Sequence, residues 1–356
     1  MQSFGTMNQK KLNKKVLVGV VGYKSEKHIK QCIMSVLEQS HPNIETIYLD
    51  NYCQDKAISI VKNNFKTIKC ISSPENLGYG RSHNLLMSNY DYDYYLPLNP
   101  DVVLDPDFIS EALSHFDEAN AFLGAINGLV LFLNGTLKTE CIYSCGHIMH
   151  KDRRIDNFNS GKNTKDVNIE TRPLFGPNGA CPLLKKEMII DISINGHFFD
   201  PIFFMYGDDI DIGWRMSKAG WWTSFSPSCK AWHMIGGSNP FQSKTIRAEY
   251  IANRYILLLK NDNIYLFLRD LPFILFLEIF FFVIHSIKRP SFMLDFFSAM
   301  IKVVKYTPYA LRSRKMTIKR IDLPSEKKLI EKNYIERILT LIMRQSSRKQ
   351  NLSTFK

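Results

Sequence analysis

The feature that most constrains this chain is an alternation between short β-rich runs and helical segments over residues 16–130. The β-rich runs, which are typical of strands, occupy residues 16–22, 44–50, 67–72 and 94–98. The helical segments lie between them, at residues 26–39, 55–64 and 79–88. Such an alternation predicts right-handed crossovers and a mostly parallel sheet. We therefore expect an α/β fold whose ligands bind beyond the carboxyl ends of the strands.

The chain is long enough for more than this one unit. Its 356 residues are 45% apolar and 22% charged, so a large core is available and wholesale disorder is excluded. Further helices are predicted at 185–191 and 247–261, and a closing helix near 326–344. We expect a main domain over 1–262, with halves at about 16–130 and 131–262, and a helical region over 263–356.

The net positive charge is confined to the end of the sequence. Residues 285–356 contain 17 Lys and Arg against 5 Asp and Glu, which accounts for the whole net charge of +12. The preceding 284 residues are therefore electrically neutral. A nucleic-acid-binding enzyme carries its positive charge around the catalytic body, so we expect no nucleic acid partner. A basic C-terminal region fits an anionic membrane surface better.

The most apolar stretch, residues 264–287, precedes this basic region. Charged or titratable residues interrupt it, namely Arg269, Asp270, Glu278 and His285. A spanning helix needs about 18 consecutive apolar residues, so we expect residues 264–306 to lie at a membrane surface instead. The alternative is that 264–287 is a buried helix or a dimer contact. Seven cysteines, odd in number and scattered, favour a reducing compartment.

Common catalytic motifs are missing from the sequence. It contains no GxxxxGK[ST] or GxGxxG loop for phosphates, no GxSxG turn and no HExxH. Carboxylates at predicted strand ends remain. Asp50 ends a strand and can accept hydrogen bonds from a base or ribose, or simply cap a helix. Asp101 follows the Asn99-Pro100 turn, where it can hold Mg²⁺ or Mn²⁺ or serve only as a turn residue.

A second group of acids begins a predicted helix. Asp208, Asp209 and Asp211 fall within four residues, more than helix capping alone explains. Asp211 and Arg215 are spaced i,i+4 and are predicted to form a structural pair. Asp208 and Asp209 lie at the mouth of the site, where a carboxylate can take a proton from an attacking hydroxyl.

Histidines occur in two places of interest. His233 follows an apolar run and precedes two glycines, so it either completes a metal site or is an ordinary loop histidine. Four metal-binding residue types cluster earlier in the chain: Cys141, Cys145, His147 and His150. No second Cys pair follows them, so we interpret that segment as a polar hairpin and not as a zinc site.

Taken together and in order, these motifs resemble those of family 2 glycosyltransferases, most closely the bacterial rhamnosyltransferase-like branch that makes cell-surface polysaccharides. The resemblance extends over about 16–260. It rests on 18–25, Leu49-Asp50-Asn51, the 75–80 turn, Leu98-Asn99-Pro100-Asp101, Asp208-Asp209 and the 233–238 loop. Two departures are present: Asn99 replaces the first acid of a DXD motif, and Asp208 stands where Glu is usual.

The resemblance implies a GT-A fold, a nucleotide-diphosphate sugar donor and inversion at the anomeric carbon. It implies that the first half of the main domain binds nucleotide and the second half binds acceptor. The donor pocket would be lined by Tyr23, Asp50, Asn51, Asn76, Gly78, Arg81, Asn99 and Asp101. Asp101 and His233 would bind Mg²⁺ or Mn²⁺. Asp209 would be the catalytic base, with Asp208 as the alternative.

The function expected from this resemblance is transfer of a sugar to a glycan or polyprenyl-linked glycan acceptor. The donor favoured is dTDP-L-rhamnose, and a UDP-hexose is possible. The enzyme would be peripheral to the cytoplasmic face of the inner membrane, and a homodimer is possible. The alternative is a catalytically silent GT-A domain that serves as a scaffold in a membrane polysaccharide assembly complex. The presence of Asp101, Asp209 and His233 favours the enzyme.

Overall fold

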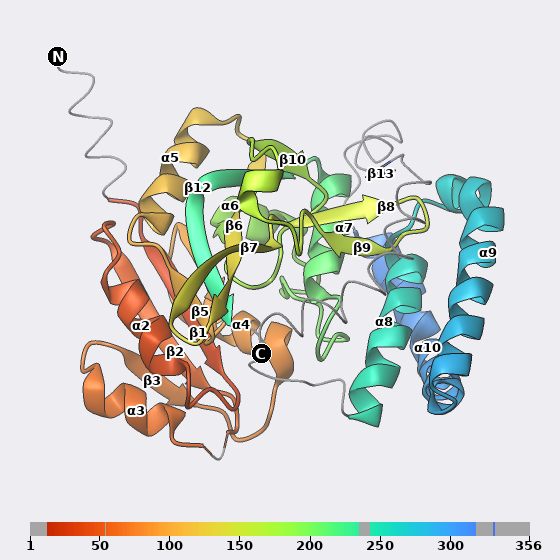
Figure 1. Cartoon of the computed structure of the whole chain (residues 1–356), viewed down its shortest axis with the longest axis horizontal. Helices are drawn as coiled ribbons and strands as arrows, with labels where there is room; N and C mark the ends of the chain where they lie inside the picture. The colour runs from red at the N-terminus through yellow and green to blue at the C-terminus, as the bar shows by residue number, and fades with distance from the viewer. Residues whose placement is uncertain (1–12, 54, 235–242, 318–329, 332–356) are drawn as a thin grey trace.

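The structure is a computed structural model that describes residues 13–53, 55–234, 243–317 and 330–331 (Figure 1). Within these residues, ten strands form the central sheet. Its main path runs β10-β12-β6-β11-β4-β1-β2-β3, with β5 paired to β12 and β7 paired to β6. A smaller sheet has the order β13-β8-β9. The predicted α/β class is confirmed.

The first half of the main domain is the parallel part of the sheet. Its strands are β1 (Val16–Gly22), β2 (Ile44–Asp50), β3 (Lys69–Ser72) and β4 (Tyr94–Leu98). Its helices are α2 (Ile29–Leu37), α3 (Ala57–Asn64) and α4 (Gly78–Asn89). All pairings among β1 to β4 are parallel, as predicted. β3 begins two residues later than predicted, because Ile68 closes a turn by donating its N–H to the Phe65 carbonyl.

The remainder of the main domain, from residue 102 onward, adds mixed pairing. Its sheet strands are β5 (Val102–Leu104), β6 (Leu123–Asn134), β7 (Leu137–Ser144), β10 (Arg172–Leu174), β11 (Leu183–Lys185) and β12 (Trp222–Met234). Its helices are α5 (Phe108–Glu118), α6 (Lys186–Ile192), α7 (Asp208–Ala219) and the short 3₁₀ helix η1 (Thr164–Asp166). β11 pairs antiparallel with both β4 and β6 and so joins the two halves.

The segment interpreted as a polar hairpin is built from short antiparallel strands. β7 ends at Ser144, and β8 (His147–His150) pairs with β9 (Ile155–Asn157). β13 (Ile330–Glu331) pairs with β8 in parallel. The predicted closing helix is therefore wrong at 330–331, because these residues complete a sheet edge; the rest of 326–344 lies outside the described residues.

The core of the first half follows from the two faces of β1. Val16, Val18 and Val20 are fully buried on the face that packs against α2 and α3. Leu17 is buried on the other face, together with residues of α4, α6 and α7. Alternate side chains of a strand point to opposite faces, so a strand covered by helices on both sides is apolar throughout. This explains the continuous apolar run that begins the sequence pattern.

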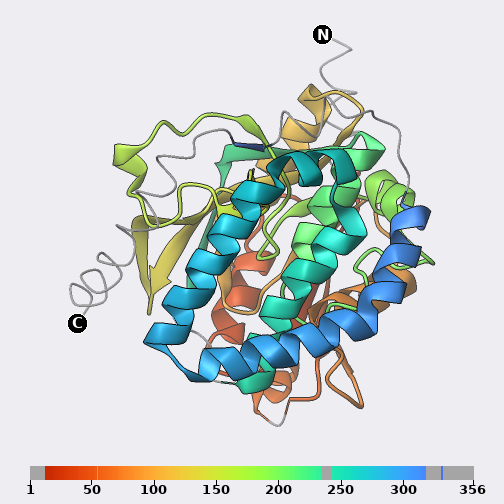
Figure 2. The ribbon, with the colours of Figure 1, turned by 90° about the vertical axis from the view of Figure 1, so that its right-hand side faces the viewer.

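Three helices follow the sheet: α8 (Lys244–Asn261), α9 (Ile264–Lys288) and α10 (Ser291–Met316). They lie across one side of the molecule, with α9 and α10 forming a hairpin (Figure 2). The predicted domain boundary at 262 falls between α8 and α9, yet α8 shares an apolar cluster with α10. Among the described helices, we find none with the length and apolar character required to cross a bilayer.

Candidate active site

The predicted donor-binding residues gather at one edge of the sheet. Tyr23 follows β1, Asp50 ends β2, and Asn99 and Asp101 follow β4. Because β1, β2 and β4 are parallel neighbours, their carboxyl ends meet at this edge. Asp50 is buried and accepts a hydrogen bond from the Cys53 N–H at 3.1 Å. The sequence thus placed these residues on the correct edge.

Asn51 and Asn76 build the turn that leads into α4. Asn51 donates from Nδ2 to Asn76 Oδ1 at 3.0 Å, and its Oδ1 accepts the Leu77 N–H at 2.8 Å. Asn76 Oδ1 also accepts the Gly78 N–H at 2.9 Å. Gly78 has φ +75° and lies against Phe204, whose carbonyl oxygen would be 2.3 Å from an added Cβ. Only glycine fits this turn without strain.

Two predicted donor-binding residues remain more exposed. Tyr23 is 46% exposed, and the Lys24 ammonium lies 5.5 Å from the centre of its ring. Arg81 is directed toward Glu75, with Nη2 3.1 Å from Oε1 in a solvent-exposed pair. Such an exposed pair contributes little to stability, about 0–1 kcal/mol. An anion that binds the Arg81 guanidinium more strongly than Glu75 can therefore displace Glu75 at a small cost in free energy.

Asp101 and His233 are brought together from segments far apart in sequence. Strand β5 pairs antiparallel with β12, placing Val102 opposite His233. The Asp101 Oδ1 and His233 Nε2 atoms are 3.1 Å apart, and both side chains are mostly buried. Burial alone would raise the pKa of Asp101, but the hydrogen bond and charge of His233 hold it below its usual value. The rest of the predicted loop, 235–238, lies outside the described residues.

This pair satisfies a geometric test for a shared cation. Ligand atoms about 2.1 Å from one ion in an octahedral site lie roughly 3 Å from each other, which matches the Asp101–His233 separation. Imidazole and carboxylate together suit Mn²⁺. No cluster of three or more His, Cys, Asp or Glu residues suited to a metal is found in the part of the chain that the structure describes. Among these described residues, Asp101 and His233 are thus a pair of candidate ligands.

Asp208 and Asp209 begin α7 after Gly207, which has φ +98°. Asp209 accepts the Gly179 N–H at its Oδ2 (3.2 Å) and the Ile210 N–H at its Oδ1 (2.9 Å). Its side chain is 21% exposed, so it reaches the surface of the site. Asp208 is buried, and burial followed by the charge of Asp209 raises the pKa of Asp208 to about 8. Asp208 therefore keeps its proton at neutral pH.

Tyr143, on β7, connects the two parts of the site. Burial raises its pKa to about 12, with further contributions from the charges of Asp101 and Asp209. Both carboxylates therefore lie within electrostatic range of the same phenol. The Tyr143 ring also packs against the His233 ring, with 4.4 Å between ring centres. Tyr143 therefore contacts the candidate metal ligand His233 and is influenced by the charges of Asp101 and of the candidate base Asp209.

Sequence reasoning missed one residue beside this base. His147 on β8 has its Nε2 3.7 Å from Asp209 Oδ2 and is buried. The clustered cysteines and histidines of 141–150 were noticed, but the segment was interpreted as a polar hairpin, whereas His147 is in fact buried. The predicted Asp211–Arg215 pair is confirmed: the two are buried, with Arg215 Nε 2.8 Å from Asp211 Oδ2.

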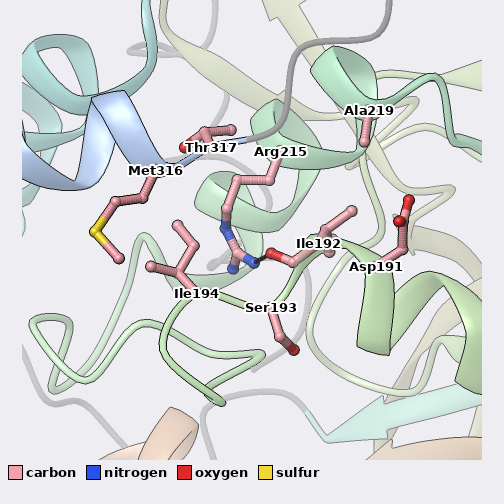
Figure 3. A pocket seen from close by; sticks show the side chains of 8 residues that line it. All are labelled: Asp191, Ile192, Ser193, Ile194, Arg215, Ala219, Met316 and Thr317. Atoms are coloured by element: carbon pink, nitrogen blue, oxygen red, sulfur yellow. Dashed lines mark hydrogen bonds between the residues drawn. The ribbon is translucent and has the colours of Figure 1, made fainter.

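A separate cavity of about 10 Å³ surrounds part of Arg215 (Figure 3). It is lined by Asp191, Ile192, Ser193, Ile194, Arg215, Ala219, Met316 and Thr317. That volume holds about one water molecule. Because it is so small and includes none of Asp101, Asp209 or His233, it is no sugar-binding site.

The chain is similar in sequence to known glycosyltransferases. Residues 17–190 match the model of Glycosyl transferase family 2. An N-acetylglucosaminyl-diphospho-decaprenol L-rhamnosyltransferase of Mycobacterium tuberculosis (strain H37Rv) is 21% identical over 262 residues, covering 68% of this chain and 83% of the relative. An uncharacterized glycosyltransferase of Haemophilus influenzae is 32% identical over 95 residues, which are 26% of this chain and 38% of that protein.

A solved structure supports the fold. The crystal structure of GalNAc-T7 with UDP, GalNAc and Mn²⁺ superposes with a TM-score of 0.55 at 11% identity. The match covers 69% of this chain but only 48% of that one, about half its length. The predicted GT-A fold is confirmed, as is the resemblance to glycosyltransferase family 2.

Proposed function

Because residues 17–190 match the model of Glycosyl transferase family 2, we propose that the chain transfers a sugar from a nucleotide-diphosphate donor, with inversion at the anomeric carbon. One observation supports this most strongly. The charge of the carboxylate Asp209 and the charge of Asp101 both contribute to the raised pKa of the Tyr143 phenol. Asp101 in turn forms a potential cation site with His233. A single in-line displacement needs one base and one charge-stabilising group, and both are available here.

We assign the base to Asp209 and not to Asp208. Asp208 is buried and protonated at neutral pH, so it cannot accept a proton. Asp209 is partly exposed, and backbone N–H groups of Gly179 and Ile210 hold its two oxygens. The acceptor hydroxyl loses its proton to Asp209 as its oxygen forms the new glycosidic bond. The bond from the anomeric carbon to the nucleoside diphosphate breaks on the opposite face of the sugar.

Asp101 and His233 would hold Mg²⁺ or Mn²⁺. When bound, such an ion offsets the negative charge that develops on the departing diphosphate. Asp50, Asn51, Asn76 and the turn at Gly78 form the wall expected to contact the nucleotide, and the Arg81 guanidinium is available to its phosphates. Removal of divalent ions with EDTA should abolish turnover, and added Mn²⁺ or Mg²⁺ should restore it. Normal turnover by the metal-free enzyme would refute this assignment.

The donor that we favour is dTDP-L-rhamnose, with a UDP-hexose as the alternative, and the acceptor is a glycan or polyprenyl-linked glycan. The named activity of the M. tuberculosis relative supports both choices. A panel of dTDP-, UDP- and GDP-sugars should be assayed for nucleoside diphosphate release with a polyprenyl-diphosphate-linked GlcNAc acceptor. Acceptor-dependent release should occur with one donor. If none is turned over in the presence of Mn²⁺, the catalytically silent scaffold is the better description.

We further propose that the enzyme binds peripherally to an anionic membrane, at the cytoplasmic face of the inner membrane. The outer surface of α9 and α10 supports this. Large apolar side chains are exposed there: Leu268, Leu275, Phe276, Ile279, Phe280, Val283, Ile287, Met293, Leu294, Phe297, Ile301 and Val304. We call this set the apolar face. Exposed cations at Lys288, Arg289 and Lys305 adjoin it, each contributing about 1 kcal/mol near anionic headgroups.

Two acids that interrupt this stretch in the sequence do not interrupt the apolar face. Asp270 pairs with Arg153 at 2.8 Å, and Glu278 pairs with Arg254 at 2.6 Å, both toward the enzyme. Co-sedimentation with vesicles should therefore rise with phosphatidylglycerol content and fall with salt. No binding at low salt would overturn the membrane proposal. Concentration-dependent dimers in gel filtration would then indicate that a second copy covers the apolar face.

A further inference from the structure

His147 is a buried histidine to which the proposed reaction assigns no role. Its Nε2 lies 3.7 Å from Oδ2 of Asp209, the oxygen that also accepts the Gly179 N–H at 3.2 Å. His147 comes from β8 and Asp209 from α7, so two separate elements meet at this carboxylate. A short side-chain movement brings the Nε2 within hydrogen-bonding distance, and such contacts commonly tighten when substrate binds.

The backbone fixes where the His147 ring can go. The His147 N–H donates to the Gly176 carbonyl at 2.9 Å, and its carbonyl accepts the Phe175 N–H at 3.0 Å. Gly176 in turn lies against Gly213 of α7, whose Cα would be 2.9 Å from a Cβ added at Gly176. Because neither glycine has a side chain, the segment that carries Gly176 can lie this close to α7. These contacts fix the backbone of His147 beside α7, so a change in the side chains alone can close the gap between Nε2 and Asp209.

Several ionisable groups surround this pair. Around Asp209 they are Asp208 from α7, Tyr79 from α4, Tyr143 from β7 and His147 from β8. Around His147 they are Asp209, and Asp156 from β9. Burial lowers the pKa of His147, and the charges of Asp209 and Asp156 oppose that shift without cancelling it. The imidazole is therefore neutral at pH 7, with one ring N–H to donate.

We propose that His147 is a positioning residue for the base: its neutral imidazole donates Nε2–H to Asp209 Oδ2. Together with the Gly179 N–H, it holds the carboxylate in one orientation and favours its ionised form. His147 itself neither gains nor loses a proton in the reaction, since the proton of the acceptor hydroxyl remains on Asp209. The inference rests on the proposed function, because it assigns the base role to Asp209.

The kinetic test uses three variants of the full-length chain. His147→Leu removes the donor, His147→Gln keeps an N–H near the Nε2 position, and His150→Leu is the matched control on the same strand. His150 pairs with Asp156 at 3.1 Å and does not contact Asp209. We expect His147→Leu to lower kcat about tenfold, the size of effect when one hydrogen bond to a charged group is lost. The KM for the donor should stay unchanged.

The pH profile separates positioning from simple structural damage. Without the His147 donor the ionised form of Asp209 is less stable, so the acidic limb of kcat should move to higher pH by about one unit. His147→Gln should recover most of kcat and return the limb toward its wild-type position. An unchanged acidic limb in His147→Leu, or equal loss in the Gln and Leu variants, would overturn the proposal.

A second measurement does not depend on turnover. NMR would follow the histidine signals of ¹⁵N-histidine-labelled protein as pH changes. The His147 signal is the one missing from His147→Gln. The same titration would then be carried out on Asp209→Asn. The Asp209 charge raises the pKa of His147, so its loss should move that midpoint to lower pH. An unmoved midpoint would refute the contact even if the enzyme is active. A moved midpoint in a protein that turns over no donor would support the contact and refute the proposed function.

Discussion

The first half of the main domain and the C-terminal helices differ in the kind of side chain that they bury against the rest of the protein. The strands β1 to β4 bury aliphatic side chains on both faces, as Val18 and Leu17 illustrate. Helices α8 to α10 also have a small apolar cluster, but they direct charged residues inward and expose the apolar face. Apolar side chains fill the interior of the first region, whereas buried ion pairs join the C-terminal helices to the rest of the protein.

One fully buried ion pair joins α8 to α7. Lys260 of α8 is fully buried, with its Nζ 2.6 Å from Asp200 and 2.7 Å from Asp211 of α7. Tyr309 of α10 donates to the other oxygen of Asp200 at 2.7 Å. Lys260 therefore links α8 directly to the helix that carries Asp208 and Asp209, and Tyr309 links α10 to the same cluster through Asp200. A change in α8 should consequently be felt at the active site, although α8 is distant in sequence.

Lys260→Met should give the largest effect on stability. Removal of one partner leaves the buried Asp200 and Asp211 carboxylates without this cation, which typically costs about 3–5 kcal/mol. Urea denaturation would measure the loss in the free energy of unfolding. The control is Lys186→Met, which breaks the exposed Lys186–Asp91 pair and should change stability by less than about 1 kcal/mol. Equal effects of the two substitutions would contradict the contrast between the regions.

Asp209→Asn should separate catalysis from stability. Loss of the base should reduce kcat by at least about 10²-fold, with donor KM little changed, because proton acceptance is lost while the nucleotide wall is intact. Stopped or continuous nucleoside diphosphate assays would measure this, and circular dichroism would check folding. Near-normal turnover would exclude Asp209 as the base.

The raised pKa of Asp208 predicts a pH-dependent stability. Between about pH 4 and pH 8, Asp208 is protonated in the folded state and ionised in the unfolded state. Its contribution to stability therefore falls as pH rises through this range. Asp208→Asn removes the titration, so the variant should gain stability relative to wild type as pH rises from 5 to 8. Denaturation at both pH values measures the difference, and a constant difference would contradict the assignment.

Substitutions in the apolar face should have the smallest effect on folding. Phe276 and Ile279 are 61% and 64% exposed, so Phe276→Ser with Ile279→Ser should change stability by no more than about 0.5 kcal/mol each. Vesicle binding should nevertheless fall strongly, because these side chains insert into the interface. Ile190→Ser, at a 65% exposed position on α6, should change neither property. Unaltered vesicle binding in the double variant would place the membrane contact elsewhere.

Local patterns were sufficient to predict the parallel strands and the donor-side residues. The carboxyl end of each strand is fixed by where its apolar run stops, so Asp50 and Asp101 could be assigned to one edge before any packing was known. The approach of Asp101 to His233 was expected from the family resemblance, and the β5–β12 pairing accounts for it physically. The predicted helix over 326–344 was wrong at 330–331, because strand pairing with β8 overrode local helical preference there.

The sequence by itself determined the α/β alternation, the positions of the carboxylates and the neutral body with its basic end. Only the tertiary structure decided which groups face one another. It brought His147 to Asp209, turned Asp270 and Glu278 toward the enzyme, and surrounded Lys260 with two carboxylates. The physical reason is the separation in sequence of the interacting residues. Strand and helix patterns arise from neighbours a few residues apart. The protonation of Asp208 and the exposure of the apolar face instead depend on contacts between distant segments.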